Sequence, residues 1–223
     1  MDKLAIFDFD GTLFTKDTLP YISKVWKAQT ANTFRYYLIY LQIAPALILY
    51  KLKLISRRTM KVWAVSKFHK IFTNMSEEEI HKLFYGVYLL IKPDFNPQII
   101  KEIKAAQSQG YHTVLLSGCY TELLKIIAHY LKIDTVLGMD LPIKDGKFDS
   151  TVPIPFIDGN AKQKLLEKTF GKENINWQIS RSYADSINDL PVLMPVGQPI
   201  VVNPEPQLLK FARANHWQII MEE

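Results

Sequence analysis

Short apolar runs alternate with amphipathic segments from residue 97 to the end of the chain, and no other feature of the sequence constrains the fold as strongly. Helices are predicted at 97–109, 120–131, 160–170 and 206–214, and strands at 112–116, 177–183, 199–202 and 217–221. A further apolar run, Leu4 to Phe7, ends at a Gly turn and predicts a strand that is buried on both faces. The pattern therefore predicts an α/β fold in which helices cover both faces of a parallel sheet, while residues 136–152 predict a small hairpin.

A long helical stretch, residues 19–92, separates the first strand from the alternating region. Between Lys16 and Lys92 there are 13 Lys and Arg but only 4 Asp and Glu, although the whole chain has a net charge of +5. This charge boundary predicts two units: a core formed by residues 1–15 and 93–223, and a helical insertion formed by residues 16–92.

Composition and motifs exclude several other classes of protein. The single cysteine, Cys119, excludes an internal disulfide and a thiolate zinc site, and it fits a reducing compartment. Acidic residues within the first ten positions are not typical of a secretory signal, so we expect a cytoplasmic protein. Lys125 stands where a cysteine phosphatase requires Arg, and the basic insertion carries no nucleic-acid-binding motif, so neither function is expected.

Four polar segments follow predicted strands or begin predicted helices. Asp8 and Asp10 follow the first strand on the same side, with Gly11 allowing a sharp turn. The other three are Ser117-Gly118, Lys162 and the segment 185–189, which contains Asp185, Asn188 and Asp189. Each segment alone also has a purely structural explanation. In chain order these are a turn, a helix N-cap, a surface lysine and a loop that caps the following helix. Because ligands bind beyond the carboxyl ends of parallel strands, their common placement predicts one site with carboxylate ligands suited to Mg²⁺.

The order DFDGT, SG, Lys and DSxxD resembles the haloacid dehalogenase (HAD) superfamily of aspartate-nucleophile phosphatases. The segments FDFDGTLFTKDT and YADSINDLPVLMPVGQPIVVNPEPQL resemble its phosphoserine phosphatase-like branch, subfamily IB. The resemblance implies a three-layer, Rossmann-like core with a parallel sheet and a helical cap domain, residues 16–92, inserted after the first strand. It also implies hydrolysis of a phosphomonoester with Mg²⁺ as the cofactor.

The resemblance assigns a role to each polar segment. Asp8 would attack phosphorus and form an aspartyl-phosphate, and Asp10 would act as the general acid and base. The metal ligands would be Asp8, Asp185 and the main-chain carbonyl of Asp10. The residues expected to support this site are Asp189, Asn188 and Thr12. The groups expected to bind the phosphoryl oxygens are Ser117, Gly118 and Lys162.

The substrate is expected to be a small phosphorylated metabolite. Asp17 stands where phosphoserine-specific members carry a Glu that binds the substrate amine, and Arg57 and Arg58 are candidates for binding a carboxylate. Phosphoserine, histidinol phosphate, other amino-alcohol phosphates and lipid phosphates all stay open, as does the oligomeric state.

Residues 36–50 carry no charge, but a membrane span needs about twenty apolar residues, so a buried cap helix is the primary prediction. The alternative is that this helix, beside Lys51 and Lys53, rests on an anionic membrane and that the protein is a lipid-phosphate phosphatase. From another functional class, a non-catalytic phosphate-binding module also stays open. A general acid such as Asp10 argues against it, since a pure binding protein does not need one.

Overall fold

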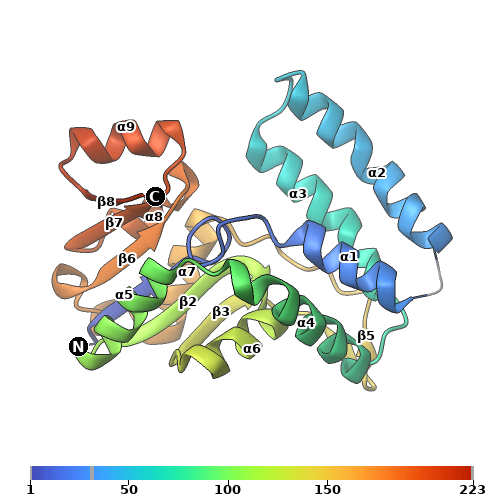
Figure 1. Ribbon diagram of the computed structural model, residues 1–223, viewed down its shortest axis with the longest axis horizontal. Helices are drawn as coiled ribbons and strands as arrows, with labels where there is room; N and C mark the ends of the chain where they lie inside the picture. The colour runs from blue at the N-terminus through green and yellow to red at the C-terminus, as the bar shows by residue number, and fades with distance from the viewer. Residues whose placement is uncertain (1, 31–32, 222–223) are drawn as a thin grey trace.

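The computed structural model describes residues 2–30 and 33–221, and its centre is a six-stranded sheet with the order β3-β2-β1-β6-β7-β8 (Figure 1). All neighbouring strands are parallel. The strands are β1(Leu4–Phe7), β2(His112–Tyr120), β3(Thr135–Met139), β6(Arg181–Ala184), β7(Gln198–Val202) and β8(Gln218–Ile220). The apolar run β1 is fully buried and pairs with β2 on one side and β6 on the other, so the first polar loop leaves the middle of the sheet.

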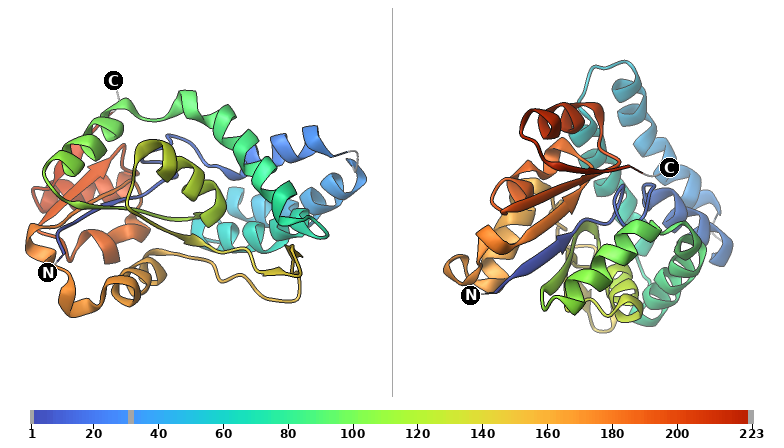
Figure 2. Two further views of the ribbon diagram at one scale, coloured as in Figure 1. Left: turned by 90° about the horizontal axis from the view of Figure 1, so that it is seen from below. Right: turned by 60° about the vertical axis from the view of Figure 1, so that its left-hand side comes forward.

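Helices cover both faces of this sheet, which confirms the predicted three-layer α/β architecture (Figure 2). The helices that follow the insertion are α5(Pro97–Ser108), α6(Thr121–Leu131), α7(Gly159–Phe170), α8(Leu190–Leu193) and α9(Pro206–Ala214). Phe7 of β1 shares one apolar core with α5 and α6, whereas its neighbour Ile6 shares another with Leu166 of α7. The alternation of side chains along a strand explains this division.

In the described part of the insertion the α-helices are α1(Leu19–Gln29), α2(Thr33–Lys51), α3(Arg57–Phe68) and α4(Glu77–Ile91). Helices α2 and α3 pack against each other beyond the carboxyl ends of the strands, and α4 packs against α1 and α6 (Figure 1). Ser76 and Glu79 form a capping box at the start of α4. The insertion therefore stands over the edge of the sheet at which the polar loops emerge.

Helix α2 differs from the prediction of a buried cap helix. Ile39, Ile43 and Ala46 are buried, but Phe34 and Leu41 on the opposite side are 73% and 70% exposed. The apolar composition of α2 predicted burial, yet α1 and α3 cover only one of its faces. No helix among the described residues combines the length and the apolar content that crossing a membrane requires.

Three element boundaries also differ from the prediction. Strand β2 does not end at Leu116 but continues to Tyr120, because Tyr120 pairs with Met139 of β3 after a register shift. The first part of the predicted strand 177–183 is a 3-10 turn, Trp177–Ile179, and β6 starts only at Arg181. The predicted hairpin 136–152 is divided: its first part is β3, an edge strand of the main sheet, and only β4(Ile143–Lys144) and β5(Lys147–Phe148) form a hairpin.

Candidate active site

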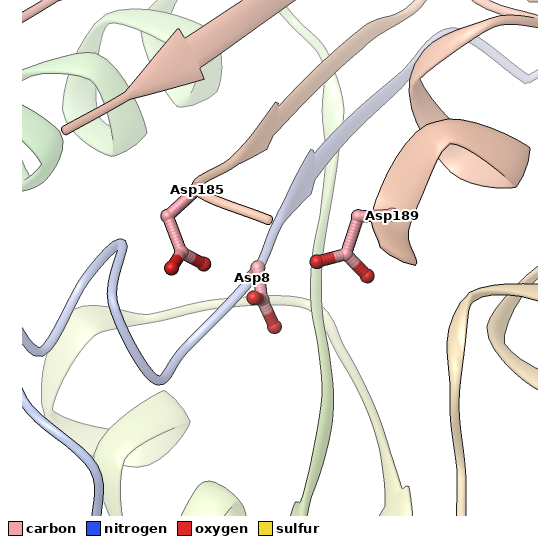
Figure 3. Close-up of side chains that lie close together, drawn as sticks. All are labelled: Asp8, Asp185 and Asp189. Atoms are coloured by element: carbon pink, nitrogen blue, oxygen red, sulfur yellow. The ribbon is translucent and has the colours of Figure 1, made fainter. Parts of the chain in front are cut away.

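The carboxylates of Asp8, Asp185 and Asp189 point toward one another beyond the ends of β1 and β6 (Figure 3). One oxygen from each lies within 4.8 Å of the others. Asp8 is positioned by its own main chain, because its N–H donates a 3.0 Å hydrogen bond to the carbonyl of Tyr183. The structure thus brings together three of the predicted residues, and their oxygen atoms are the kind of ligand that Mg²⁺ prefers.

Lys162 lies among these acids. Its Nζ donates hydrogen bonds of 2.8 Å to Asp8 Oδ1 and 2.7 Å to Asp189 Oδ1, and all three side chains are buried. Burial lowers the pKa of Lys162, but the charges of Asp189 and Asp8 outweigh it and raise the pKa, so the ammonium stays protonated. Burial raises the pKa of Asp8 to about 6 against the opposing effect of Lys162. Three acids and one lysine leave an excess of negative charge, which fits a bound divalent cation.

Gly11 allows the loop after β1 to pass next to Asp185. Its φ of +87° is in the region that favours glycine, and a Cβ at this position would clash with the Asp185 carboxylate. Thr12, which follows, is fully buried, and its N–H donates to the carbonyl of Phe9. Its Oγ1 has no hydrogen-bond partner among the described residues. Thr12 does not line the cavity of the site, so it lies behind the site rather than in its wall.

Asp10 faces Thr18, the residue that precedes α1. The main-chain N–H of Thr18 donates a 3.1 Å hydrogen bond to Asp10 Oδ1, and the hydroxyl group of Thr18 donates to the same oxygen. Removal of the carboxyl group from water raises the pKa of Asp10 to about 7, although the hydrogen bond from Thr18 opposes the rise. A carboxyl group that exchanges its proton near neutral pH can act as both an acid and a base.

Ser117 and Gly118 lie in the irregular end of β2 and not at the start of the next helix. Helix α6 begins at Thr121, so Ser117 is not its N-cap, contrary to one of the alternatives. The buried Ser117 Oγ accepts a 3.1 Å hydrogen bond from the N–H of Cys119. A Cβ at Gly118 would lie 2.8 Å from the carbonyl oxygen of Ile157, so glycine allows this close approach. Burial raises the pKa of the Cys119 thiol well above its usual range, which argues against a thiolate nucleophile.

The start of α7 and the 185–189 loop meet through their main chains. A Cβ at Gly159 would clash with the carbonyl oxygen of Asn188, so only glycine permits this contact. The loop itself is held by Glu205, whose Oε1 accepts a 2.8 Å hydrogen bond from the N–H of Ile187. Glu205 was not predicted, because it precedes α9 and nothing in its local sequence connects it with the loop.

A cavity of about 310 Å³ connects these groups with the insertion. Nearly all predicted site residues line it, namely Asp8, Asp10, Asp17, Arg58, Ser117, Gly118, Lys162, Asp185, Asn188 and Asp189. Thr12 is an exception, and the side chain of Arg57 lies outside the described residues. Sequence reasoning missed Thr18, Lys61 and Asp158, which also line the cavity.

Two ion pairs occupy the rim of this cavity. Arg58 Nε lies 2.7 Å from Oδ2 of Asp158, the N-cap residue of α7. Lys61 Nζ lies 2.8 Å from Oδ1 of Asp17. Lys61 follows Arg58 by three positions on α3, so helical spacing alone indicated that it lies on the same side of the helix as the predicted candidate Arg58.

The sequence matches the family model of the haloacid dehalogenase-like hydrolases over residues 5–194. It is 26% identical to histidinol-phosphatase of Neisseria meningitidis, with 99% of each chain covered. It is 24% identical to phosphoserine phosphatase of Methanocaldococcus jannaschii over 94% of this chain and 90% of that protein. In its fold it is similar to a crystal structure of a protein of unknown function from Bordetella pertussis, with a TM-score of 0.80, 19% identity and 99% of both chains covered.

Proposed function

Since this chain belongs to the haloacid dehalogenase-like hydrolase family and is a phosphoric monoester hydrolase, we propose that it uses Mg²⁺ and Asp8 to hydrolyse its substrate through an aspartyl-phosphate. The observation that supports this most is the convergence of Asp8, Asp185 and Asp189 around Lys162 at the carboxyl edge of the sheet. Asp8, Asp185 and the main-chain carbonyl of Asp10 would hold the ion, which reduces the repulsion between a carboxylate and a phosphate dianion.

In the first step an oxygen of Asp8 attacks phosphorus from the side opposite the ester oxygen. The bond between phosphorus and the substrate oxygen breaks, and Asp10 donates a proton to that oxygen, so an alcohol leaves. The pKa of Asp10, raised to about 7, supports this role because part of the carboxyl population is protonated near neutral pH.

In the second step a water molecule attacks the phosphorus of the aspartyl-phosphate. Asp10, now a carboxylate, accepts the proton of the water, and inorganic phosphate leaves as Asp8 is regenerated. In both steps Lys162, the hydroxyl of Ser117 and the N–H of Gly118 would bind the phosphoryl oxygens. Asp189 would hold Lys162 in place, since the two side chains are hydrogen-bonded. Asn188 and Thr12 are assigned supporting roles, the former in the cavity wall and the latter behind the Asp8 loop.

We assign the insertion, residues 16–92, the role of a cap. Its helices α1, α2 and α3 contribute residues to the wall of the cavity, and Arg58 connects α3 with Asp158 of the core. A cap in this position would exclude water from the aspartyl-phosphate until the alcohol has left.

The first substrates to test are the small phosphate esters predicted from the sequence. The names of two relatives, histidinol-phosphatase and phosphoserine phosphatase, support their choice. The alternative of a non-catalytic phosphate-binding module is less well supported, because burial raises the pKa of Asp10 to about 7 and a protein that only binds phosphate does not need a general acid.

Hydrolysis of p-nitrophenyl phosphate tests the proposed chemistry. We expect turnover that requires Mg²⁺, stops with EDTA and is absent in Asp8→Asn. Wild-type protein that is denatured in acid during turnover should carry one phosphoryl group on the peptide that contains Asp8. Turnover by Asp8→Asn, or a phosphoryl group on another residue, would contradict the assignment of the nucleophile.

A further inference from the structure

The cavity has a polar end and an apolar end. The carboxylates and Lys162 form the polar end, beneath the cap. The walls of the other end come from the cap helices and the core segment before α7, and include Ile22, Ile43, Leu47, Val65, Phe68 and Phe156. Binding pockets of small molecules usually occupy roughly 300–1,000 Å³, so a cavity of about 310 Å³ has room for a phosphate and one apolar group of moderate size.

The cations at the rim are already paired. Among the described residues that line the cavity, the positively charged side chains from the cap are those of Arg58 and Lys61. Arg58 is paired with Asp158, and Lys61 is paired with Asp17. A substrate with a free carboxylate would have to compete with these acids for a partner. An apolar chain needs no such partner, and the apolar wall removes it from water.

The apolar wall continues to the outer surface of α2. Leu47 lines the cavity and is also 39% exposed. Beyond it the outer face of α2, which we define as Phe34, Tyr37, Leu41, Ile48 and Leu52, is exposed to solvent. These residues are spaced by three, four or seven positions, close to one or two helical turns, so they form one stripe along the helix and its end. Exposed apolar surfaces of this kind mark contact with a protein or a membrane.

The charge around this stripe indicates whether a protein or a membrane covers it. No Asp or Glu occurs between Thr18 and Ser76, a stretch that contains ten Lys and Arg. Lys51 and Lys53, at the end of α2, are both exposed. A second copy of this chain would bring like charges together, whereas the headgroups of anionic lipids would neutralise them.

We propose that the outer face of α2 lies in the surface of an anionic membrane and that the enzyme hydrolyses single-chain lipid phosphomonoesters, whose apolar chain enters the cavity past Leu47. This inference rests on the proposed function and gives it a substrate class. The helix lies on the membrane and does not cross it, in agreement with its length and with Pro45. The P–O bond that breaks is the one described above, and the products are a neutral lipid alcohol and phosphate.

The chain dependence of catalysis tests the substrate class. Glycerol 3-phosphate is compared with its butanoyl, hexanoyl and octanoyl esters, which stay monomeric in solution. We expect kcat/KM to rise with chain length, by up to about fourfold for each methylene that becomes buried. Val65→Trp, which fills the apolar end, should reduce this rise. A kcat/KM for wild-type protein that is independent of chain length, or that is highest for phosphoserine, would overturn the proposal.

Flotation with vesicles tests the membrane contact. Wild-type protein should float with vesicles of phosphatidylcholine and phosphatidylglycerol at low salt, and less with phosphatidylcholine alone. Leu41→Asp should abolish flotation, whereas Leu89→Asp, the same change at an exposed site on α4, should not. Melting curves show whether both variants fold. Absence of flotation by wild-type protein overturns the proposal, as does a dimer in sedimentation that Leu41→Asp dissociates.

Turnover of p-nitrophenyl phosphate separates this inference from the proposed function. If that ester is hydrolysed and the acyl esters are not preferred, the substrate class is wrong and the phosphatase chemistry stands. If neither ester is hydrolysed with Mg²⁺, the proposed function itself is wrong.

Discussion

Lys162 donates a 2.8 Å hydrogen bond to Asp8, although the two residues are 154 positions apart and belong to different layers of the fold. The ammonium and the carboxylate are both buried, so Asp8 depends on Lys162 to remain charged in the absence of a ligand, whereas Lys162 is stabilised by Asp189 and Asp8 together. When a phosphate binds, its oxygens can take the place of Asp8 as partners of Lys162. The lysine then stabilises the negative charge that develops in the transition state.

We therefore expect Lys162→Met to lower kcat for p-nitrophenyl phosphate by roughly 10²–10³-fold at saturating Mg²⁺. Lys164→Met removes the same charge from an exposed position on the same helix and is the matched control. Steady-state kinetics of both variants check the prediction. Equal losses in the two would mean that helix α7 tolerates neither change and that Lys162 has no special role.

Gly11→Ala should weaken the use of Mg²⁺, because the new methyl group would displace the Asp185 carboxylate. We expect at least a tenfold increase in the Mg²⁺ concentration that gives half-maximal activity. Gly110→Ala is the control: Gly110 has a φ of +72°, but apart from its two chain neighbours no other described residue has an atom within 4 Å of the position that a Cβ would take. Gly110→Ala should therefore lose only the roughly 1–2 kcal/mol of folding stability that a positive φ costs an alanine, and its Mg²⁺ dependence should be unchanged.

Asp10→Asn should separate the two proposed steps. Because p-nitrophenolate leaves without a proton, the first step should continue, while hydrolysis of the aspartyl-phosphate slows by roughly 10²–10⁴-fold. Phosphorylated protein should accumulate, as measured by intact mass after acid quench. For phosphate esters of alkyl alcohols, which need a protonated leaving group, the first step should slow as well and no phosphorylated protein should be seen. Accumulation with both kinds of ester would show that Asp10 is not the acid.

His69 should make the protein sensitive to mild acid. Burial lowers the pKa of His69 to about 4, whereas in the unfolded chain it is about 6.5. The folded state therefore binds this proton less readily, so the stability that depends on neutral His69 is complete above about pH 6.5 and is lost as the pH falls toward 4. Allowing for solvent screening, we expect wild-type protein to lose about 1 kcal/mol more than His69→Phe between pH 7 and pH 5.

Urea denaturation of both proteins at the two pH values checks this prediction. The comparison concerns the change with pH, so a uniform effect of the substitution on packing against Tyr120 cancels. Equal pH dependence in the two proteins, or an NMR titration of the His69 ring near pH 6.5, would contradict it.

The polar segments of the site could be predicted because the fold repeats a simple unit. A strand that is buried on both faces must end before its first charged residue, and this placed Asp8 and Asp185 at the same edge of the sheet. The end of β2 was predicted less well. The local sequence Ser117-Gly118 predicts the end of the strand, but pairing of Tyr120 with Met139 extends it. Such pairing between distant segments leaves no local signal in the sequence.

The rim of the cavity could not be predicted for a similar reason. The pairs Arg58–Asp158 and Lys61–Asp17 depend on how α3 packs over the core, and the sequence of a helix does not contain its packing angle. The exposed face of α2 is a further case. Apolar composition shows that a helix avoids water, but it does not show whether protein or lipid covers each side.

The contact between Gly159 and the carbonyl of Asn188 has a consequence for engineering. Two main chains that touch leave no side chain to adjust when one of them is exchanged, so a grafted 185–189 loop would keep its geometry only if the first turn of α7 came from the same donor protein. A chimaera that replaces both segments together should be active, and one that replaces either alone should misplace the ammonium group relative to its acids.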